Sequence, residues 1–308
     1  MQIRFYGVRG SIPTPGPSTV RYGGNSVCVE VRISDGTRIV LDAGTGIREL
    51  GKALIAERCR SPIHVFITHS HWDHIMGLPF FAPIYASDST IVMHAATPRS
   101  AQAIRNADIF NPTHFPVGFA ELPARFERIE DFGEHRVGAA RVRHIELNHP
   151  GGATGFRIDD ADGSSVCYLT DNELDPPGPP GPPGTPVVTP AQLARFAAGT
   201  DLLIHDAQYL ADDMPAKRGW GHSVVDQVLA LARDAEARTV ALHHHDPDRD
   251  DDALDAIAEH AAQWTRDHAP GLRAVVAREG LAISQRETGA GDPDGRTGGA
   301  SRGSNEPR

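Results

Sequence analysis

The sequence predicts an α/β fold in which sheets are covered by helices. Short β-branched or alternating apolar segments dominate its first half, whereas helical and strand-like periodicity alternate in the second half. The chain has 308 residues, of which 40% are hydrophobic and 23% are charged. It is therefore long enough to bury a substantial core in one large domain or two small ones.

The individual elements follow from these periodicities. Strand patterns run through residues 3–7, 26–33, 37–41, 63–68, 90–94, 137–147, 154–158 and 166–170, and later through residues 201–204, 239–242 and 274–277. Helical spacing covers residues 46–57, 98–107, 190–198, 223–235 and 251–268. The later helices separate the later strands, an order that is typical of sheets flanked by helices.

Two segments interrupt this pattern. Residues 175–186 read DPPGPPGPPGTP, which has too few Gly-spaced triplets for a collagen helix, so we expect a stiff connector or a wall of the site. The segment from residue 285 onward is too poor in apolar side chains to fold. We therefore expect a folded domain over residues 1–284 and a disordered tail over residues 285–308.

Composition and charge restrict the cellular setting and the partners. The first residues lack the basic-then-apolar order of a signal peptide, and no apolar run approaches membrane-spanning length, so we expect a cytoplasmic protein without a membrane partner. Three cysteines without paired spacing argue against a disulfide framework or a cysteine zinc site. A formal net charge of -10 disfavours a nucleic acid polymer as a partner.

The segment THSHWDHIMG, residues 68–77, carries the strongest chemical signal. Three histidines and one aspartate fall within residues 69–74, directly after the apolar strand pattern IHVFIT. Loops that leave strand ends commonly carry the sites of α/β proteins. Because imidazole and carboxylate are ligands for zinc and manganese, the segment predicts a metal site.

The pattern His-x-His-x-Asp-His resembles the signature of the metallo-β-lactamase-fold hydrolases. The resemblance extends over residues 1–284, includes the glycine-rich turn DAGTG at residues 42–46, and implies a four-layer αββα sandwich. It also implies two divalent metal ions, zinc or manganese. The ligands that it implies are His69, His71, His149 and Asp171 for one ion, and Asp73, His74, Asp171 and His244 for the other.

Three adjacent histidines compete for the last ligand position. The late His of the family lies three residues before a proline, which selects His244. In an extended backbone His243 and His245 would point elsewhere, so we expect them to support the ligands or to lie at the surface.

The segments LLIHDAQY and GWGHSVV resemble the His-Glu-Ala-Thr and His-Ser-Thr motifs of the phosphodiesterase branch that contains tRNase Z. The resemblance implies that Asp206 orients His222 and that His222 protonates the leaving oxygen. The chain departs from the first motif by having Asp206 for Glu and Gln208 for Thr. Lactamases and glyoxalase-like thioesterases lack this pair, so we expect P–O cleavage with Asp73, His222 and Asp206 as catalytic residues.

The predicted substrate is a small phosphodiester, in first place a cyclic nucleotide, attacked by a metal-activated hydroxide. The N-terminal segment resembles a bacterial subgroup described as cyclic-nucleotide-phosphodiesterase-like. The tRNA-processing enzymes of the branch carry a long basic arm between the third His and the bridging Asp, and the segment between His149 and Asp171 is too short for one. RNA 3′ processing of the tRNase Z type, and thioester or lactone hydrolysis on the same fold, are the alternatives.

Four residues are predicted to contact the substrate. Arg9 and Asn25 lie in the N-terminal loops, where they would bind phosphate or ribose. Trp220 would stack on a base, and His114 would line the pocket. The apolar segment PFFAPIY, residues 79–85, suits a pocket wall or a homodimer interface equally well.

Overall fold

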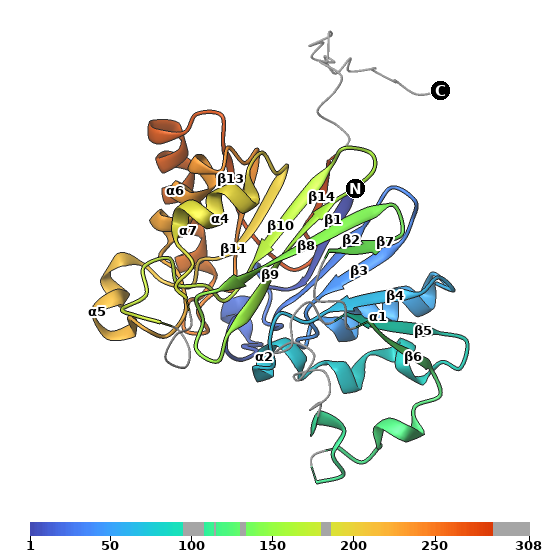
Figure 1. The fold of residues 1–308 in the computed structure, drawn as a ribbon. Helices are drawn as coiled ribbons and strands as arrows, with labels where there is room; N and C mark the ends of the chain where they lie inside the picture. The colour runs from blue at the N-terminus through green and yellow to red at the C-terminus, as the bar shows by residue number, and fades with distance from the viewer. Residues whose placement is uncertain (95–107, 114, 130–133, 180–185, 286–308) are drawn as a thin grey trace, which may run out of the picture.

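The computed structural model describes residues 1–94, 108–113, 115–129, 134–179 and 186–285. In this part of the chain, two seven-stranded sheets pack face to face (Figure 1). In spatial order, the first sheet contains β14 (Ala282–Ser284), β1 (Gln2–Gly7), β2 (Cys28–Arg32), β3 (Arg38–Leu41), β4 (Ile63–Phe66), β5 (Thr90–His94) and β6 (Arg125–Ile129). The second contains β13 (Arg273–Val276), β12 (Thr239–His243), β11 (Leu202–Asp206), β10 (Ser165–Leu169), β9 (Ala153–Asp159), β8 (Ala140–Leu147) and β7 (His135–Val137).

The direction of the strands places many carboxyl ends at one edge. Strands β3 to β6 are parallel, and so are strands β10 to β13. Strand β8 runs antiparallel to β9, which runs antiparallel to β10, so β8 ends at the same edge as β10. The carboxyl-terminal edge of an α/β sheet is where ligand sites commonly lie.

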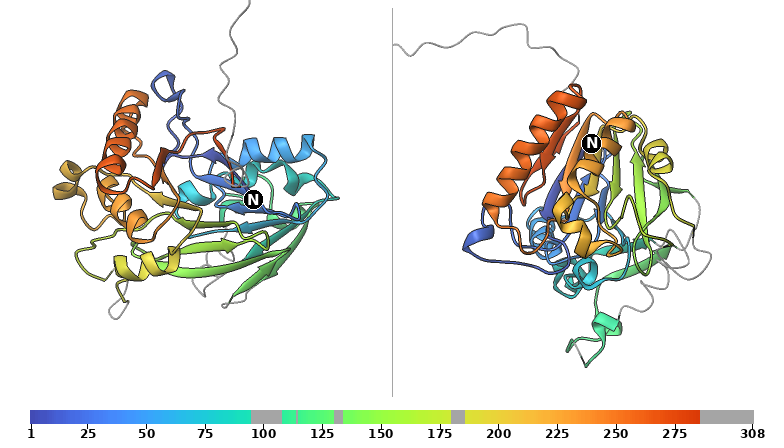
Figure 2. Two further views of the ribbon diagram at one scale, coloured as in Figure 1. Left: turned by 90° about the horizontal axis from the view of Figure 1, so that it is seen from above. Right: turned by 90° about the vertical axis from the view of Figure 1, so that its left-hand side faces the viewer.

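Helices cover the outer face of each sheet and complete the predicted αββα sandwich (Figures 1 and 2). The second sheet is covered by α4 (Pro190–Ala197), α6 (Val225–Asp234) and α7 (Asp251–His268), and the first by α1 (Ile47–Ala56). The connections contain α2 (Trp72–Ile75), α5 (Met214–Lys217) and the 3-10 turns η1 (Pro17–Thr19), η2 (Leu78–Phe80), η3 (Ala82–Tyr85), η4 (Asp108–Phe110), η5 (Phe119–Glu121) and η6 (Ala211–Asp213). Among the described residues, no helix combines the length and the apolar composition needed to cross a membrane.

Alternate strand residues build the core between the sheets. Phe5 and Phe66 of the first sheet and Phe156 and Tyr168 of the second are fully buried there. Their strand neighbours face the helices, because successive side chains point to opposite faces of a sheet. Truncating one of the buried rings, as in Phe156→Ala, would cost about 3–5 kcal/mol. This rigid double sheet holds the strand ends in place.

Most predicted strands and helices are confirmed, with two differences. The predicted strand 137–147 is divided into β7 and β8, because Gly138 adopts a φ of 54° and turns the chain. Strands β6 and β14 were not predicted, since both are short edge strands of mixed sequence. The predicted helix 98–107 and the predicted tail beyond Gln285 lie outside the described residues. The backbone N–H of Gln285 donates to the carbonyl of Met1 at 3.2 Å.

Candidate metal centre

The histidine-rich segment leaves β4 and enters the short helix α2. His71 immediately precedes the helix, and Asp73 and His74 lie within it. Asp73 and His74 are 4% and 0% exposed, whereas Trp72 is 59% exposed. One helical turn therefore directs the two polar side chains inward and leaves the indole at the surface.

Three further side chains reach the same place from other strand ends. His149 follows β8, Asp171 follows β10 and His244 follows β12. Asp171 and His244 have φ values of 58° and 59°, in the left-handed region that is costly for residues other than glycine. Strain of this kind persists only where the surrounding structure holds it, and it clusters at functional sites.

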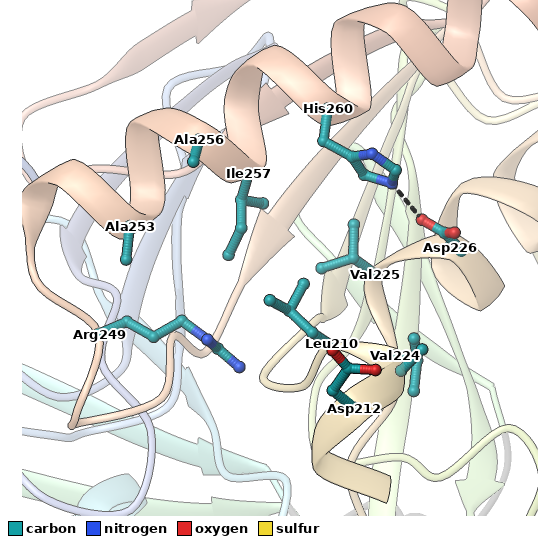
Figure 3. Close-up of a pocket in the computed structure, with 11 residues that line it drawn as sticks. Leu210, Asp212, Val224, Val225, Asp226, Arg249, Ala253, Ala256, Ile257 and His260 are labelled. Carbon is teal, nitrogen blue, oxygen red and sulfur yellow. Dashed lines mark hydrogen bonds and ion pairs between the residues drawn. The ribbon is translucent and has the colours of Figure 1, made fainter.

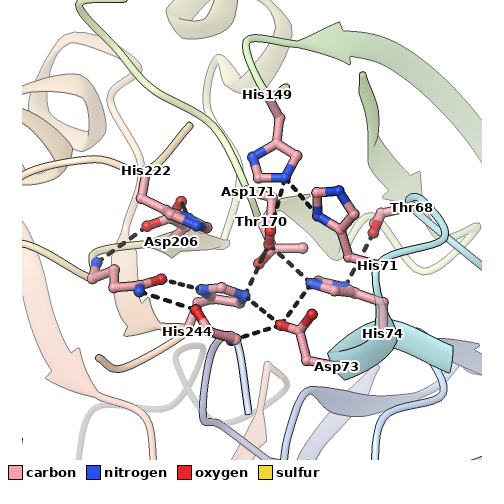
Figure 4. A network of polar contacts seen from close by, with 12 residues as sticks. Thr68, His71, Asp73, His74, His149, Thr170, Asp171, Asp206, His222 and His244 are labelled. Carbon is pink, nitrogen blue, oxygen red and sulfur yellow. Dashed lines mark hydrogen bonds and ion pairs between the residues drawn. The ribbon is translucent and has the colours of Figure 1, made fainter. Parts of the chain in front are cut away.

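Asp171 lies between two groups of imidazoles (Figure 4). Its Oδ2 atom is 3.5 Å from Nε2 of His69 and from Nε2 of His149. Its Oδ1 atom is 3.1 Å from Nε2 of both His74 and His244. The carboxylate thus occupies the position from which one side chain can reach two cations.

Candidate ligand atoms form three overlapping groups in the described part of the chain. Within each group, the nitrogen and oxygen atoms lie within 4.8 Å of one another. One group contains His69, His71, His149 and Asp171, the second contains Asp73, His74 and His244, and the third contains Asp171, His222 and His244. The structure therefore brings together every side chain that the sequence proposed as a ligand.

The protonation of these groups fits a divalent cation. Burial lowers the pKa of His69 and His71, and lowers that of His149 to about 4, so these imidazoles are neutral at pH 7. The Nε2 atom of His69 is buried and has no hydrogen-bond partner among the described residues. Neutral imidazole nitrogens beside ionised carboxylates form a donor set that zinc and manganese accept.

The pKa of His74 reflects the negative charge of the carboxylates around it. Although burial opposes the shift, Asp171, Asp73 and Asp42 raise the pKa of His74 well above its usual value. The site thus attracts positive charge, and a divalent cation would take the place of that proton.

Asp42, in the DAGTG turn, holds His74 from behind. This fully buried carboxylate lies 2.9 Å from Nδ1 of His74 and accepts from the backbone N–H of Thr68 at 2.8 Å and the hydroxyl of Tyr168 at 3.0 Å. With its Nδ1–H donated to Asp42, His74 directs Nε2 toward the centre. The glycine-rich turn marked this position in the sequence, but its partner was visible only in the structure.

Glu173 performs a similar task for His149 through the backbone, a role that the sequence did not suggest. Its carboxylate accepts N–H groups of Gly219 at 2.9 Å and Gly221 at 3.0 Å, and the Gly221 carbonyl lies 3.0 Å from Nδ1 of His149. Gly221 has a φ of 89°, and a Cβ there would lie 2.3 Å from His149, so no side chain fits. Nε2 of His149 is therefore left for the cluster.

Asp206 and His222 lie in contact beside the cluster. Oδ2 of Asp206 is 2.9 Å from Nδ1 of His222, and Oδ1 accepts the backbone N–H of Gln208 at 3.1 Å. Burial opposes protonation of His222, but Asp206 outweighs it and raises the pKa of His222 to about 9. The His222 ring stacks on His244 at 4.9 Å, so a protonated imidazole faces the centre.

Two of the predicted substrate contacts, Arg9 and Asn25, are engaged within the fold. Arg9 is fully buried, and its guanidinium donates to the carbonyls of Gly23 at 2.8 Å and Arg249 at 2.6 Å. It therefore ties loops together instead of reaching a substrate. The side-chain amide of Asn25 donates to Glu279 at 2.9 Å, which likewise engages it in the fold.

The remaining predicted contacts have mixed outcomes. Trp220 is 60% exposed, and its role in stacking stays a prediction, whereas His114 lies outside the described residues.

His243 and His245 are not at the surface, since both are buried. Their Nε2 atoms lie 3.1 Å from the carbonyl of Gly7 and 2.7 Å from that of Ala277, respectively.

A separate pocket of about 410 Å³ lies between α7 and the segment that begins α6 (Figure 3). Leu210, Val225 and Ile257 form much of its lining, and Arg249 points across it toward Leu210. Its lining residues contribute to none of the candidate ligand groups found among the described residues. We therefore assign the chemistry to the His and Asp cluster.

Residues 37–245 match the family model described as a β-lactamase superfamily domain. The chain belongs to this superfamily. Ribonuclease Z from Haloarcula marismortui, a curated relative, is 25% identical over 287 residues, which cover 79% of this chain and 86% of the relative.

Solved structures of the superfamily share the fold. The metallo-β-lactamase-fold protein YhfI from Bacillus subtilis matches with a TM-score of 0.64 and 16% identity over 92% of this chain and 98% of that chain. The short form of human tRNase Z matches with a TM-score of 0.60 and 19% identity over 92% and 99%. Together with the His and Asp cluster, the superfamily assignment makes the chain a metal-dependent hydrolase.

Proposed function

We propose that the chain hydrolyses phosphodiesters at this cluster, and the observation that carries the proposal is the contact between Asp206 and His222. A phosphodiester releases an alkoxide, which needs a proton as it leaves. His222 is held 2.9 Å from Asp206, and that carboxylate raises the pKa of His222 to about 9. The imidazolium is therefore available as a proton donor at neutral pH, beside the ligand groups.

The ligand groups would hold two divalent cations. His69, His71, His149 and Asp171 would hold one, and Asp73, His74, Asp171 and His244 the other. When bound, such cations acidify coordinated water and neutralise charge that develops on phosphate. The chain itself supplies ligand geometry through Asp42 and Glu173 and a proton through His222.

RNA is the first substrate class to test. Curated relatives that are 25% and 22% identical to this chain are named ribonuclease Z. This favours RNA 3′ processing over a cyclic nucleotide substrate. A small diester is the second candidate. It is favoured by the net charge of -10 and by the tight turn between β9 and β10. In that turn the backbone N–H of Asp160 donates to the carbonyl of Ser164 at 2.9 Å, so this turn contains no inserted basic arm.

A substrate panel tests the proposal. Protein reloaded with zinc or with manganese would be given precursor tRNA, 2′,3′- and 3′,5′-cyclic nucleotides, a chromogenic phosphodiester, a thioester and a lactone, each beside Asp73→Ala. Cleavage of precursor tRNA at one position, with steep salt dependence, would support RNA as the substrate. Turnover of small diesters alone would support the second candidate, and turnover confined to the thioester or lactone would overturn phosphodiester hydrolysis.

A further inference from the structure

Gln208, which stands where the related motif has Thr, contacts His244. Its side chain is buried, with the residue 3% exposed, and its Oε1 lies 2.9 Å from Nδ1 of His244. Its Nε2 donates to Oγ of Ser11 at 3.3 Å. A Thr side chain at this position would be too short to span both partners.

The opposite nitrogen of His244 faces the centre. Nε2 lies 3.1 Å from Asp171 and 3.2 Å from Asp73 (Figure 4). An imidazole that offers the lone pair of Nε2 to a cation carries its proton on Nδ1, and that N–H requires an acceptor. The amide oxygen of Gln208 is an acceptor at hydrogen-bond distance.

The amide group of Gln208 also connects His244 to the N-terminal loop. Ser11 has a φ of 65°, and its backbone N–H donates to Oδ2 of Asp73 at 2.8 Å. At Gly10 a Cβ would lie 2.2 Å from Nδ1 of His244, so only glycine lets the loop approach this closely. Through Ser11, Gln208 is linked to a second candidate ligand.

The backbone of Gln208 is held on both sides. Its N–H donates to Oδ1 of Asp206 at 3.1 Å, and its carbonyl accepts from Nε of Arg249 at 3.4 Å. Arg249, which crosses the pocket of Figure 3, is itself paired with Asp213. A side chain on so restrained a backbone can fix the orientation of its neighbour.

An amide suits this position better than a carboxylate would. Asp73, Asp171 and Asp206 already place three carboxylates around His244 and His222. The amide oxygen of Gln208 can accept the Nδ1–H of His244 without adding a fourth carboxylate. The corresponding partner of His74 is a carboxylate, that of Asp42.

We propose that Gln208 is a positioning residue that fixes the tautomer of His244 and, through Ser11, the placement of Asp73. The inference rests on the metal centre of the proposed function but not on the identity of the substrate. Loss of such an outer contact typically weakens metal binding by about 10- to 100-fold. The effect should fall on the cation held by Asp73, His74 and His244.

Two variants and a matched control test the inference by metal binding. Gln208→Met keeps the length of the side chain but removes both hydrogen bonds, whereas Gln208→Glu keeps the acceptor for His244. Gln263→Met makes the same change at an exposed position of α7, where the amide contacts Asp267. Zinc dissociation constants would be measured by competition with a chromophoric chelator. We expect Gln208→Met to weaken the binding of one of the two equivalents by about 10- to 100-fold, Gln208→Glu to weaken it less, and Gln263→Met to stay within a few-fold of wild type.

The outcomes separate the inference from the proposed function. If wild-type protein binds no metal, both are wrong. If wild type and Gln208→Met bind two equivalents with the same affinities, the inference alone is overturned. Nitrogen NMR of the metal-free wild-type protein, at a pH where His244 is neutral, needs no variant that must fold: His244 protonated on Nδ1 supports the inference, and His244 protonated on Nε2 contradicts it.

Discussion

Asp206 and His222 form a buried pair in which Oδ2 lies 2.9 Å from Nδ1. Asp206 is fully buried and also accepts the backbone N–H groups of Asn172 at 3.1 Å and Ser223 at 3.3 Å. These bonds fix the carboxylate, so the imidazole that it holds is fixed as well. The pair joins two segments that the sequence related only through their motifs.

Replacing Asp206 by Asn should shift the pH profile of kcat. The Asp206 carboxylate raises the pKa of His222 to about 9 against the effect of burial, so without this charge the pKa falls. Because His222 acts in its protonated form, activity should then be lost at a lower pH as the pH rises. The change should also lower kcat, by about 10²- to 10⁴-fold if proton donation fails. Asp226→Asn, at an exposed carboxylate paired with His260, serves as the control; an alkaline limb that stays in place in Asp206→Asn would contradict the proposed role.

Replacing His222 by Ala should slow cleavage according to the leaving group. A diester with an alkoxide leaving group should lose about 10²- to 10⁴-fold in kcat, because nothing protonates the oxygen. A diester with a nitrophenolate leaving group, which departs without a proton, should lose far less. Steady-state kinetics on the two substrates provide the measurement, and equal losses on both would rule out a general acid role.

Removing Asp171 should disrupt both cation sites, since its two oxygens face different groups of imidazoles. We expect Asp171→Ala to retain less than one equivalent of zinc after dialysis, and Asp73→Ala to retain about one, where wild type retains two. Metal content measured by atomic emission, with exposed Asp35→Ala as the control, checks this. Full occupancy in Asp171→Ala would exclude the bridging assignment.

Replacing Asp42 by Ala should destabilise even the metal-free protein. The change leaves Thr68, His74 and Tyr168 with buried donors that have lost their acceptor, at about 1–3 kcal/mol for each donor left unpaired. Urea unfolding measures the loss of free energy. Asp35→Ala removes a carboxylate that accepts from Thr37 and Ala139 at an exposed site, and it should cost less than about 1 kcal/mol, because water replaces the lost bonds.

The sequence predicted most of the sheet strands, and the structure brings together the seven ligand candidates that the family resemblance implies. Short motifs that follow strand ends can be recognised in the local sequence, and a two-sheet sandwich brings those strand ends together. Of the three adjacent histidines, His244 is the one that lies in the candidate ligand groups. His243 still belongs to β12 and packs near Phe5, whereas His244 turns into the site through its left-handed φ of 59°.

Contacts between distant segments were the part that local patterns missed. Arg9 and Asn25 lie in polar loops as expected, but the direction of a loop side chain depends on which backbone or carboxylate packs beside it. The partners of Asp42, Glu173 and Gln208 lie 32, 48 and 36 residues away in the chain. Such pairs become visible only once the strands are assembled.

The most direct test of a metal-dependent phosphodiesterase is a metal titration followed by hydrolysis of a phosphodiester. Protein stripped with a chelator should show no turnover of precursor tRNA or of small diesters, and turnover should return as two equivalents of zinc or manganese are added. In His222→Ala, the same titration should restore metal binding without restoring cleavage of an alkoxide diester. Turnover that survives complete stripping, or that returns only toward a thioester or lactone, would contradict the account.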